Sequence, residues 1–173
     1  MAEYNGFLTG QDKNATSEKE KEQLFFQGVL AYLCDRPAEA FETFIGLTGE
    51  DSVAAYFNCS LCCYKAGDYE PALTYLNEAE KLFELPLKLK PQTMKHLTLY
   101  EYEKKGTGYL SPMLKDSPKL FPEPSMMQLL RVKADILYAL GYTDELRKLL
   151  PSLSGDNFEN IDRIRRELDK TDL

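Results

Sequence analysis

The sequence has little positive charge and no long apolar run. Its 21 Lys and Arg residues are outnumbered by 28 Asp and Glu residues, which gives a formal net charge of -7. Phosphate contacts need a basic face, so this balance argues against nucleic acid as a partner, and it would also repel anionic lipid head groups. No run approaches the roughly 18 apolar residues of a membrane-spanning helix. Neither nucleic acid nor a membrane is therefore an expected partner.

The N-terminus also lacks the features of a secretory signal. Residues 1–22 contain no basic start followed by an apolar core. Four cysteines without such a signal suggest free thiols in a reducing compartment, and we expect a cytoplasmic protein. With 173 residues, 43% of them hydrophobic and 28% charged, the chain suits one well-buried domain.

Residues for catalysis and metal binding are scarce. The single histidine, His96, has no nucleophile motif around it. Cys59, Cys62 and Cys63 share one helix face, but a zinc site normally adds a second pair of ligands from elsewhere. Packing as small hydrophobes is the favoured interpretation, and a metal or redox site is the alternative. We expect no enzyme activity, no cofactor and no metal.

A helical hairpin over residues 53–83 is the most informative stretch. Two amphipathic helices should be joined by a turn at Gly67-Asp68. Ala72, Leu76 and Ala79 lie on one face of the second helix, where their small or apolar side chains allow close packing. The hairpin is the unit with which the rest of the chain can be compared.

A similar hairpin precedes it. A capping box, Ser17 followed by Glu20, predicts a helix from near Glu18, and a second helix should run from Ala38 to about Leu47. The two hairpins correspond with a shift of 32 residues: Leu24, Gly28 and Ala31 match Tyr56, Ser60 and Cys63, while Ala40, Phe44 and Leu47 match Ala72, Leu76 and Ala79.

A third hairpin follows later in the chain. Its apolar and turn positions are Leu130, Ala134, Leu137, Gly141, Leu146, Leu150 and Leu153. The spacing of 12 residues between the two helices recurs in all three hairpins (28 to 40, 60 to 72 and 134 to 146). A recurrence at three places is stronger than any one motif.

Residues 85–125 interrupt the pattern. Pro91 should start a helix that runs towards Gly106 and carries Met94, Leu97, Leu99, Tyr100 and Tyr102. The prolines at 112, 118, 122 and 124 should then exclude a long helix. A decayed repeat and an insert are both possible, and we favour an insert because the prolines stand where a second helix should run.

The C-terminal residues predict one more helix, from Asp156 to about Asp169. Its apolar stripe would consist of Phe158, Ile161, Ile164 and Leu168. Glu159 with Arg163, and Asp162 with Arg166, should form ion pairs on the solvated side. A stack of hairpins leaves an apolar end open, and this helix should close it.

The hairpin residues resemble a tetratricopeptide repeat: Tyr56, Cys59, Ser60 and Cys63 stand in its first block, and Ala72 and Leu76 in its second. The resemblance implies an all-α fold, a TPR-like α-α superhelix. It would comprise three helical hairpins (about 18–50, 51–84 and 126–154), an insert before the third (85–125) and a C-terminal capping helix (156–170). Residues 17–173 would form a single domain, preceded by a flexible tail (1–16).

In this family the first helix of each repeat lines a concave groove. The resemblance implies a peptide-binding groove lined by Phe25, Val29, Tyr32, Phe57, Asn58, Leu61, Tyr64, Arg131, Asp135 and Tyr138. The family's carboxylate clamp is doubtful, because only Asn58 suits it among the corresponding residues Phe25, Val29, Asn58, Gln128 and Val132. The groove should prefer apolar or extended segments.

The resulting prediction is a non-catalytic scaffold or adaptor that binds another protein or peptide in this groove, with a secretion-type chaperone as a sharper variant. Replacing Tyr32 and Tyr64 by alanine should then abolish partner capture and leave the thermal midpoint nearly unchanged. The alternative is a self-associating structural subunit, such as a homodimer, whose groove is filled by its own insert, by its N-terminal tail or by a second copy.

Overall fold

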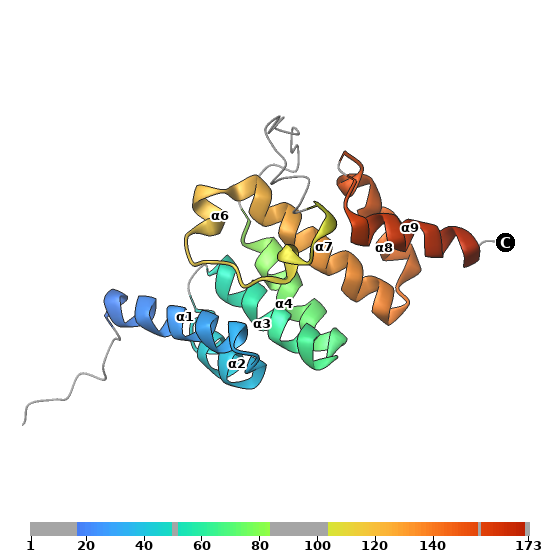
Figure 1. Cartoon of the computed structure of the whole chain (residues 1–173). Helices are drawn as coiled ribbons and strands as arrows, with labels where there is room; N and C mark the ends of the chain where they lie inside the picture. The colour runs from blue at the N-terminus through green and yellow to red at the C-terminus, as the bar shows by residue number, and fades with distance from the viewer. Residues whose placement is uncertain (1–16, 50–51, 84–103, 156, 172–173) are drawn as a thin grey trace, which may run out of the picture.

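A computed structural model describes residues 17–49, 52–83, 104–155 and 157–171, and these residues contain helices and no strand (Figure 1). The all-α class expected from the sequence is therefore confirmed for this part of the chain. The expected helix between Pro91 and Gly106 lies mostly outside the described residues, as do His96 and the N-terminal tail.

The first two helices are α1 (Glu18–Leu33) and α2 (Pro37–Ile45). The predicted capping box is present: the Glu20 N–H donates to Ser17 Oγ at 3.3 Å, and the Ser17 N–H donates to Glu20 Oε2 at 2.7 Å. Proline begins α2 because the first helical residue needs no N–H donor. Gly28 lets the two helices approach closely at Phe44, which is fully buried.

The central hairpin consists of α3 (Val53–Ala66) and α4 (Tyr69–Lys81). Its small residues bring the two backbones together, since Ser60, Ala72, Leu76 and Ala79 are all fully buried. The Ser60 hydroxyl donates to the Ala72 carbonyl at 2.7 Å. The two residues that the sequence pattern placed 12 apart are therefore in direct contact.

The third hairpin begins earlier than the sequence pattern suggested. A short helix, α6 (Ser117–Leu120), leads into α7 (Pro122–Leu140), followed by α8 (Thr143–Leu149) and the 3-10 helix η2 (Leu150–Leu153). The expectation that the prolines exclude a long helix holds up to Phe121, where α6 has only four residues, and was wrong beyond it. Pro122 and Pro124 lie in the first turn of α7, where the backbone N–H groups have no helical acceptor to lose.

The last helix, α9 (Glu159–Thr171), packs against α7. All four residues of its predicted apolar stripe are buried, from Phe158 to Leu168. The predicted ion pairs along α9 are not the ones formed: Arg163 pairs with Asp135 of α7, and Arg166 donates to the backbone carbonyl of Asp162. Asp156, the predicted cap, lies outside the described residues.

The three hairpins share one turn. In each, a residue with positive φ follows the first helix: Asp35 (φ 62°), Gly67 (φ 84°) and Gly141 (φ 72°). Its N–H bonds to the carbonyl of a tyrosine three residues earlier, Tyr32, Tyr64 or Tyr138, and the next N–H bonds to the residue before that tyrosine. This is the paired hydrogen-bond pattern of a Schellman turn. It recurs at the intervals of 32 and 74 residues that separate the hairpins.

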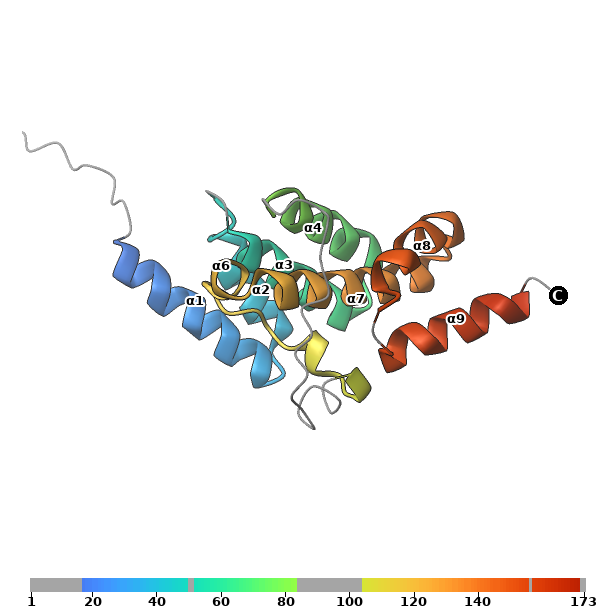
Figure 2. The ribbon, with the colours of Figure 1, turned by 90° about the horizontal axis from the view of Figure 1, so that it is seen from above.

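The helices pack largely in chain order, α1 on α2, α2 on α3, α3 on α4, α4 on α7 and α7 on α8. Their buried side chains form one continuous apolar core. Figure 2 shows α4 and α8 on one side of α7, while α1, α9 and residues 108–116 lie on the other. None of the described helices has the length and apolar character needed to cross a membrane.

Candidate functional site

Most residues of the predicted groove are buried. Phe25, Val29, Tyr32, Phe57, Asn58, Leu61, Arg131 and Asp135 are buried, Tyr64 is half-buried, and Tyr138 is 41% exposed. We define the groove face as the surface of α1, α3 and α7 that carries Tyr32, Asn58, Gln128, Arg131 and Asp135. The groove face is not open to solvent, because another part of the chain lies on it.

Residues 106–116, called the covering segment below, lie across the groove face (Figure 2). The side chain of Asn58 binds both main-chain polar groups of one residue, Met113. Its Nδ2 donates to the Met113 carbonyl at 2.9 Å, and its Oδ1 accepts from the Met113 N–H at 2.8 Å. Asn58 is fully buried, so these two bonds satisfy groups that have no access to water.

Two further side chains of the groove face bind the backbone of this segment. The Tyr32 hydroxyl donates to the Leu110 carbonyl at 3.1 Å. Gln128 Nε2 donates to the carbonyls of Tyr109 at 3.2 Å and Ser111 at 2.8 Å. Helices α1, α3 and α7 therefore each contribute a side chain that recognises the covering segment by its main chain.

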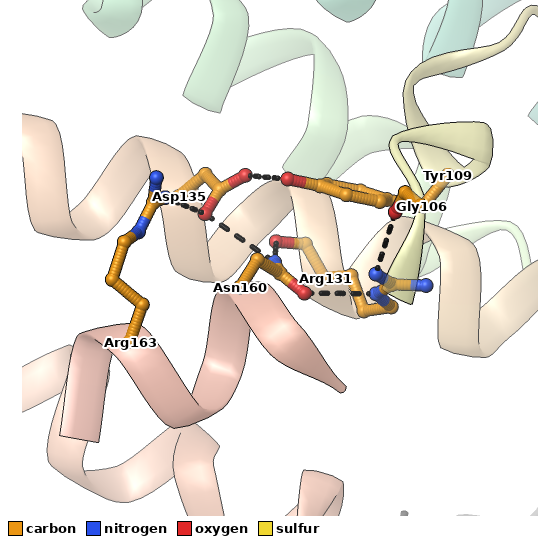
Figure 3. Close-up of polar contacts among 6 residues, drawn as sticks. All are labelled: Gly106, Tyr109, Arg131, Asp135, Asn160 and Arg163. Atoms are coloured by element: carbon orange, nitrogen blue, oxygen red, sulfur yellow. Dashed lines mark hydrogen bonds and ion pairs between the residues drawn. The ribbon is translucent and has the colours of Figure 1, made fainter. Parts of the chain in front are cut away.

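The Tyr109 side chain is the polar anchor of the segment (Figure 3). Its hydroxyl donates to Asp135 Oδ2 at 2.5 Å, and its ring lies 4.0 Å from the guanidinium carbon of Arg131. Arg131 in turn donates to the carbonyl of Gly106 at 3.4 Å. Two charged residues one turn apart on α7 thus hold one aromatic residue of the covering segment.

Helix α9 completes this cluster from the other side (Figure 3). Asn160 accepts from Arg131 Nε at 3.0 Å and donates to Asp135 Oδ1 at 3.3 Å, and Arg163 donates to the same Asp135 oxygen at 3.4 Å. The ring centroid of Phe158 also lies 4.4 Å from the guanidinium carbon of Arg131. The capping helix and the covering segment are therefore joined through the same two α7 residues.

Burial changes the acidity of the tyrosines at this face. It raises the pKa of Tyr32 to about 12, and that of Tyr64 to about 12 with a further contribution from Asp135. Burial, followed by the charge of Asp135 and its hydrogen bond, also raises the pKa of Tyr109. All three hydroxyls stay protonated at neutral pH, so Tyr32 and Tyr109 act as hydrogen-bond donors.

Tyr32, Tyr64 and Tyr138 each lie four residues after the small residue of their hairpin (28, 60 and 134), but they do not form one surface. Tyr32 is beneath the covering segment, Tyr64 packs edge-on against Tyr69 with ring centroids 5.8 Å apart, and Tyr138 is exposed. The shared register places each tyrosine at the turn of its hairpin. Because the covering segment crosses only part of the helices, the three rings meet different surroundings.

The cysteines of α3 lie within the packed core. Cys59 and Cys62 are buried and Cys63 is half-buried. Burial raises the pKa of the Cys62 thiol to about 12 and also raises that of Cys59, so both remain protonated thiols at neutral pH. Within the described residues, no three His, Cys, Asp or Glu side chains are placed to hold a metal ion.

Sequence reasoning missed Tyr109 and Met113, which have no helical periodicity to mark them, and Asn160, a polar residue in the first turn of α9. A signal was nevertheless present in their partners. Asn58, Arg131 and Asp135 are polar residues on otherwise apolar helix faces, and a buried polar group needs a hydrogen-bonding partner. Such positions predict that another segment must supply the missing groups.

Comparison of the chain with protein-family models, with curated proteins and with solved structures found no match.

Proposed function

We propose that this chain is a non-catalytic protein-interaction scaffold of the tetratricopeptide type, whose groove face binds a non-α-helical polypeptide segment. The observation that carries the proposal is the way the covering segment is held. Asn58, Tyr32 and Gln128 bind main-chain groups of four residues, 109, 110, 111 and 113. Main-chain recognition by side chains from several helices is suited to a non-α-helical ligand segment of variable sequence, whose carbonyls are not used up by helical hydrogen bonds.

The repeated turn supports the tetratricopeptide arrangement. Three hairpins with the same Schellman turn, packed largely in chain order, are the units from which a helical superhelix is built. In such an arrangement the first helices of successive hairpins form one surface. The groove face draws its residues from α1, α3 and α7, which are the first helices of the three hairpins.

The covering segment then occupies the position of a ligand. In this state the protein binds its own chain, and a partner must replace residues 106–116 at the groove face. Mutating the anchors of the segment, with Tyr109→Ala and Met113→Ala together, should release it and leave Asn58, Tyr32 and Gln128 intact. We call this double mutant the released variant.

The test is a binding screen of the released variant against a library of unrelated peptides. Binding by some of these peptides, lost when Asn58→Ala is added to the released variant, supports the proposal. A matched control is Gln27→Ala, which changes an exposed side chain of α1. Failure to bind any peptide, with the far-ultraviolet circular dichroism of a folded helical protein, would contradict it.

A second candidate function is self-association as a structural subunit. Phe26, Leu30 and Leu33 lie on one stripe of α1, opposite Gly28, which packs against α2, and are 57%, 44% and 62% exposed. End hairpins of a stack normally present a polar outer face. Light scattering across a concentration series would test this function, because Leu30→Glu should abolish a dimer formed through the stripe, whereas Leu120→Gln, on α6, should not.

A further inference from the structure

The covering segment is bound through two kinds of contact. Main-chain contacts hold a segment of any sequence, and side-chain contacts give the sequence preference. The bonds to the carbonyls of residues 109, 110 and 111, and to both polar groups of Met113, use main-chain atoms only. Any segment with the same backbone course, a 3-10 turn at residues 108–110 followed by residues outside a helix, offers such carbonyls. These contacts therefore fix where a ligand lies on the groove face and do not select its side chains.

Two side chains of the segment enter the protein. Tyr109 and Met113 are 8% and 2% exposed, whereas Ser111 and Leu114 are exposed to solvent, the latter at 57%. The spacing of the buried pair is four residues. The groove face would recognise the side chains of a ligand in the same register at these two positions, and the residues between them could vary.

The first position selects a tyrosine. The guanidinium carbon of Arg131 lies 4.0 Å from the ring centroid of Tyr109, and Asp135 accepts a hydrogen bond from the hydroxyl at 2.5 Å. Phenylalanine would fill the ring position and leave Asp135 without this donor. A buried site that hydrogen-bonds a hydroxyl discriminates strongly against an analogue without one.

The second position selects a long unbranched apolar side chain. Met113 belongs to the continuous core, and the side-chain amide of Asn58 binds the N–H and the carbonyl of Met113. Methionine adapts to irregular apolar spaces because it has three rotatable bonds. Beyond it, Lys115 reaches Glu18 of α1 at 3.4 Å, a surface ion pair that adds a weak preference for a basic residue.

We infer that the partner of the groove face is a protein segment with a tyrosine in a short 3-10 turn, like Tyr109 in η1 (Gly108–Leu110), and a methionine four residues later. The covering segment is a built-in copy of this ligand. This inference depends on the proposed function and adds the side chains that the site selects. Because the tethered copy has an effective concentration of the order of millimolar, an external segment must compete with it.

The test uses a fluorescent peptide with the sequence of residues 106–116, GTGYLSPMLKD, and measures its binding by anisotropy. The released variant should bind it at least ten times more tightly than the wild-type protein does. A peptide with phenylalanine in place of the tyrosine, or alanine in place of the methionine, should bind at least ten times more weakly. Adding Asn58→Ala to the released variant should remove binding of all three peptides.

The outcomes separate the two proposals. Equal binding of the peptide and of a scrambled peptide of the same composition would overturn the tyrosine–methionine preference and leave main-chain recognition standing. Absence of binding to any peptide by the folded released variant would overturn both. A wild-type dimer that dissociates when the peptide is added would assign the site to a second copy and overturn the partner proposed here.

A further measurement covers a released variant that does not fold. In that case the peptide should restore its helical circular dichroism, because the missing anchors are supplied by the added chain. Tyr109→Phe, which keeps the ring, should also gain thermal stability from the peptide while the wild-type protein should not. If the peptide neither restores helicity nor shifts the thermal midpoint, the inference is overturned.

Discussion

The side-chain amide of Asn58 and the main-chain N–H and carbonyl of Met113 satisfy each other, with one hydrogen bond in each direction at 2.9 and 2.8 Å. Both residues are buried, so neither group has water as an alternative partner. This pair joins the centre of α3 to a segment 55 residues later in the chain.

Asn58→Ala should destabilise the protein by about 2–4 kcal/mol, because it leaves a buried N–H and a buried carbonyl without partners. Chemical denaturation measures this change. Gln27→Ala, on the exposed side of α1, should change the free energy of unfolding by less than about 0.5 kcal/mol. Similar small effects of the two mutations would show that the covering segment contributes little to the fold.

Gly28→Ala should destabilise the protein although alanine favours helix by about 1 kcal/mol over glycine. A Cβ at position 28 would lie 2.8 Å from Cε1 of the buried Phe44, and such overpacking costs about 1–3 kcal/mol. In a Phe44→Leu background the same mutation should be neutral or stabilising, which a double-mutant cycle would reveal. A raised melting temperature for Gly28→Ala alone would contradict the close approach.

Mutations of two α9 residues one turn apart, Asn160 and Arg163, should differ sharply in their effect on the free energy of unfolding. Asn160→Ala should cost about 2 kcal/mol or more, because buried Asn160 links Arg131 and Asp135. Arg163→Ala should cost less than about 1 kcal/mol, since the Arg163 side chain is 60% exposed and 3.4 Å from Asp135. Denaturant midpoints of both variants provide the measurement, and the reverse order would refute the described cluster.

Alkaline pH should weaken the fold through the buried tyrosines. Their pKa values are raised in the folded protein, to about 12 for Tyr32 and in the same direction for Tyr109, whereas an unfolded tyrosine ionises near pH 10. The stabilisation is thus complete below pH 10 and is lost as the pH rises towards the folded values.

Tyr109→Phe should reduce this pH dependence. With one ionising group fewer, the slope of the unfolding free energy between about pH 10 and 12 should fall by about 1.4 kcal/mol per pH unit. In urea titrations, the unfolding free energy of the wild type should exceed that of Tyr109→Phe at pH 7, and this difference should shrink as the pH rises. Parallel curves for wild type and variant would contradict the raised pKa of Tyr109.

Asp35→Gly should stabilise the first hairpin by about 0.5–1 kcal/mol, because Asp35 has a φ of 62° in a turn where the other hairpins have glycine. Loss of its ion pair with Lys65 should matter little, since the Asp35 side chain is 83% exposed. Gly67→Ala should have the opposite sign. Thermal unfolding of both variants is the measurement, and destabilisation by Asp35→Gly would count against backbone strain at this turn.

The helices were predictable where local signals act. The Ser17–Glu20 box, the small residues of α3 and α4 and the stripe of α9 gave the correct elements because capping and periodicity depend on neighbours in sequence. The prolines in the first turn of α7 led to a wrong prediction, because proline is tolerated in the first turn of a helix and disrupts its interior. Whether these prolines allow a helix therefore depends on their position in it and not on their number.

The candidate site was only partly predictable. Asn58, Arg131 and Asp135 were identified as groove residues, yet they are covered by residues 106–116, which carry no periodic pattern. The expectation that Tyr32→Ala with Tyr64→Ala leaves the thermal midpoint unchanged must also be revised. Tyr32 is buried and bonded to the Leu110 carbonyl, so its removal should lower the midpoint.

The two ends of the helical stack differ in a way that matters for engineering. Helix α9 closes the side of α7 with four buried apolar residues, whereas α1 leaves Phe26, Leu30 and Leu33 in contact with solvent. An additional designed hairpin joined ahead of Ser17 would meet a ready apolar surface and lengthen the array. The same hairpin joined after Thr171 would lack such a surface, because the described residues of α9 expose no large apolar side chain.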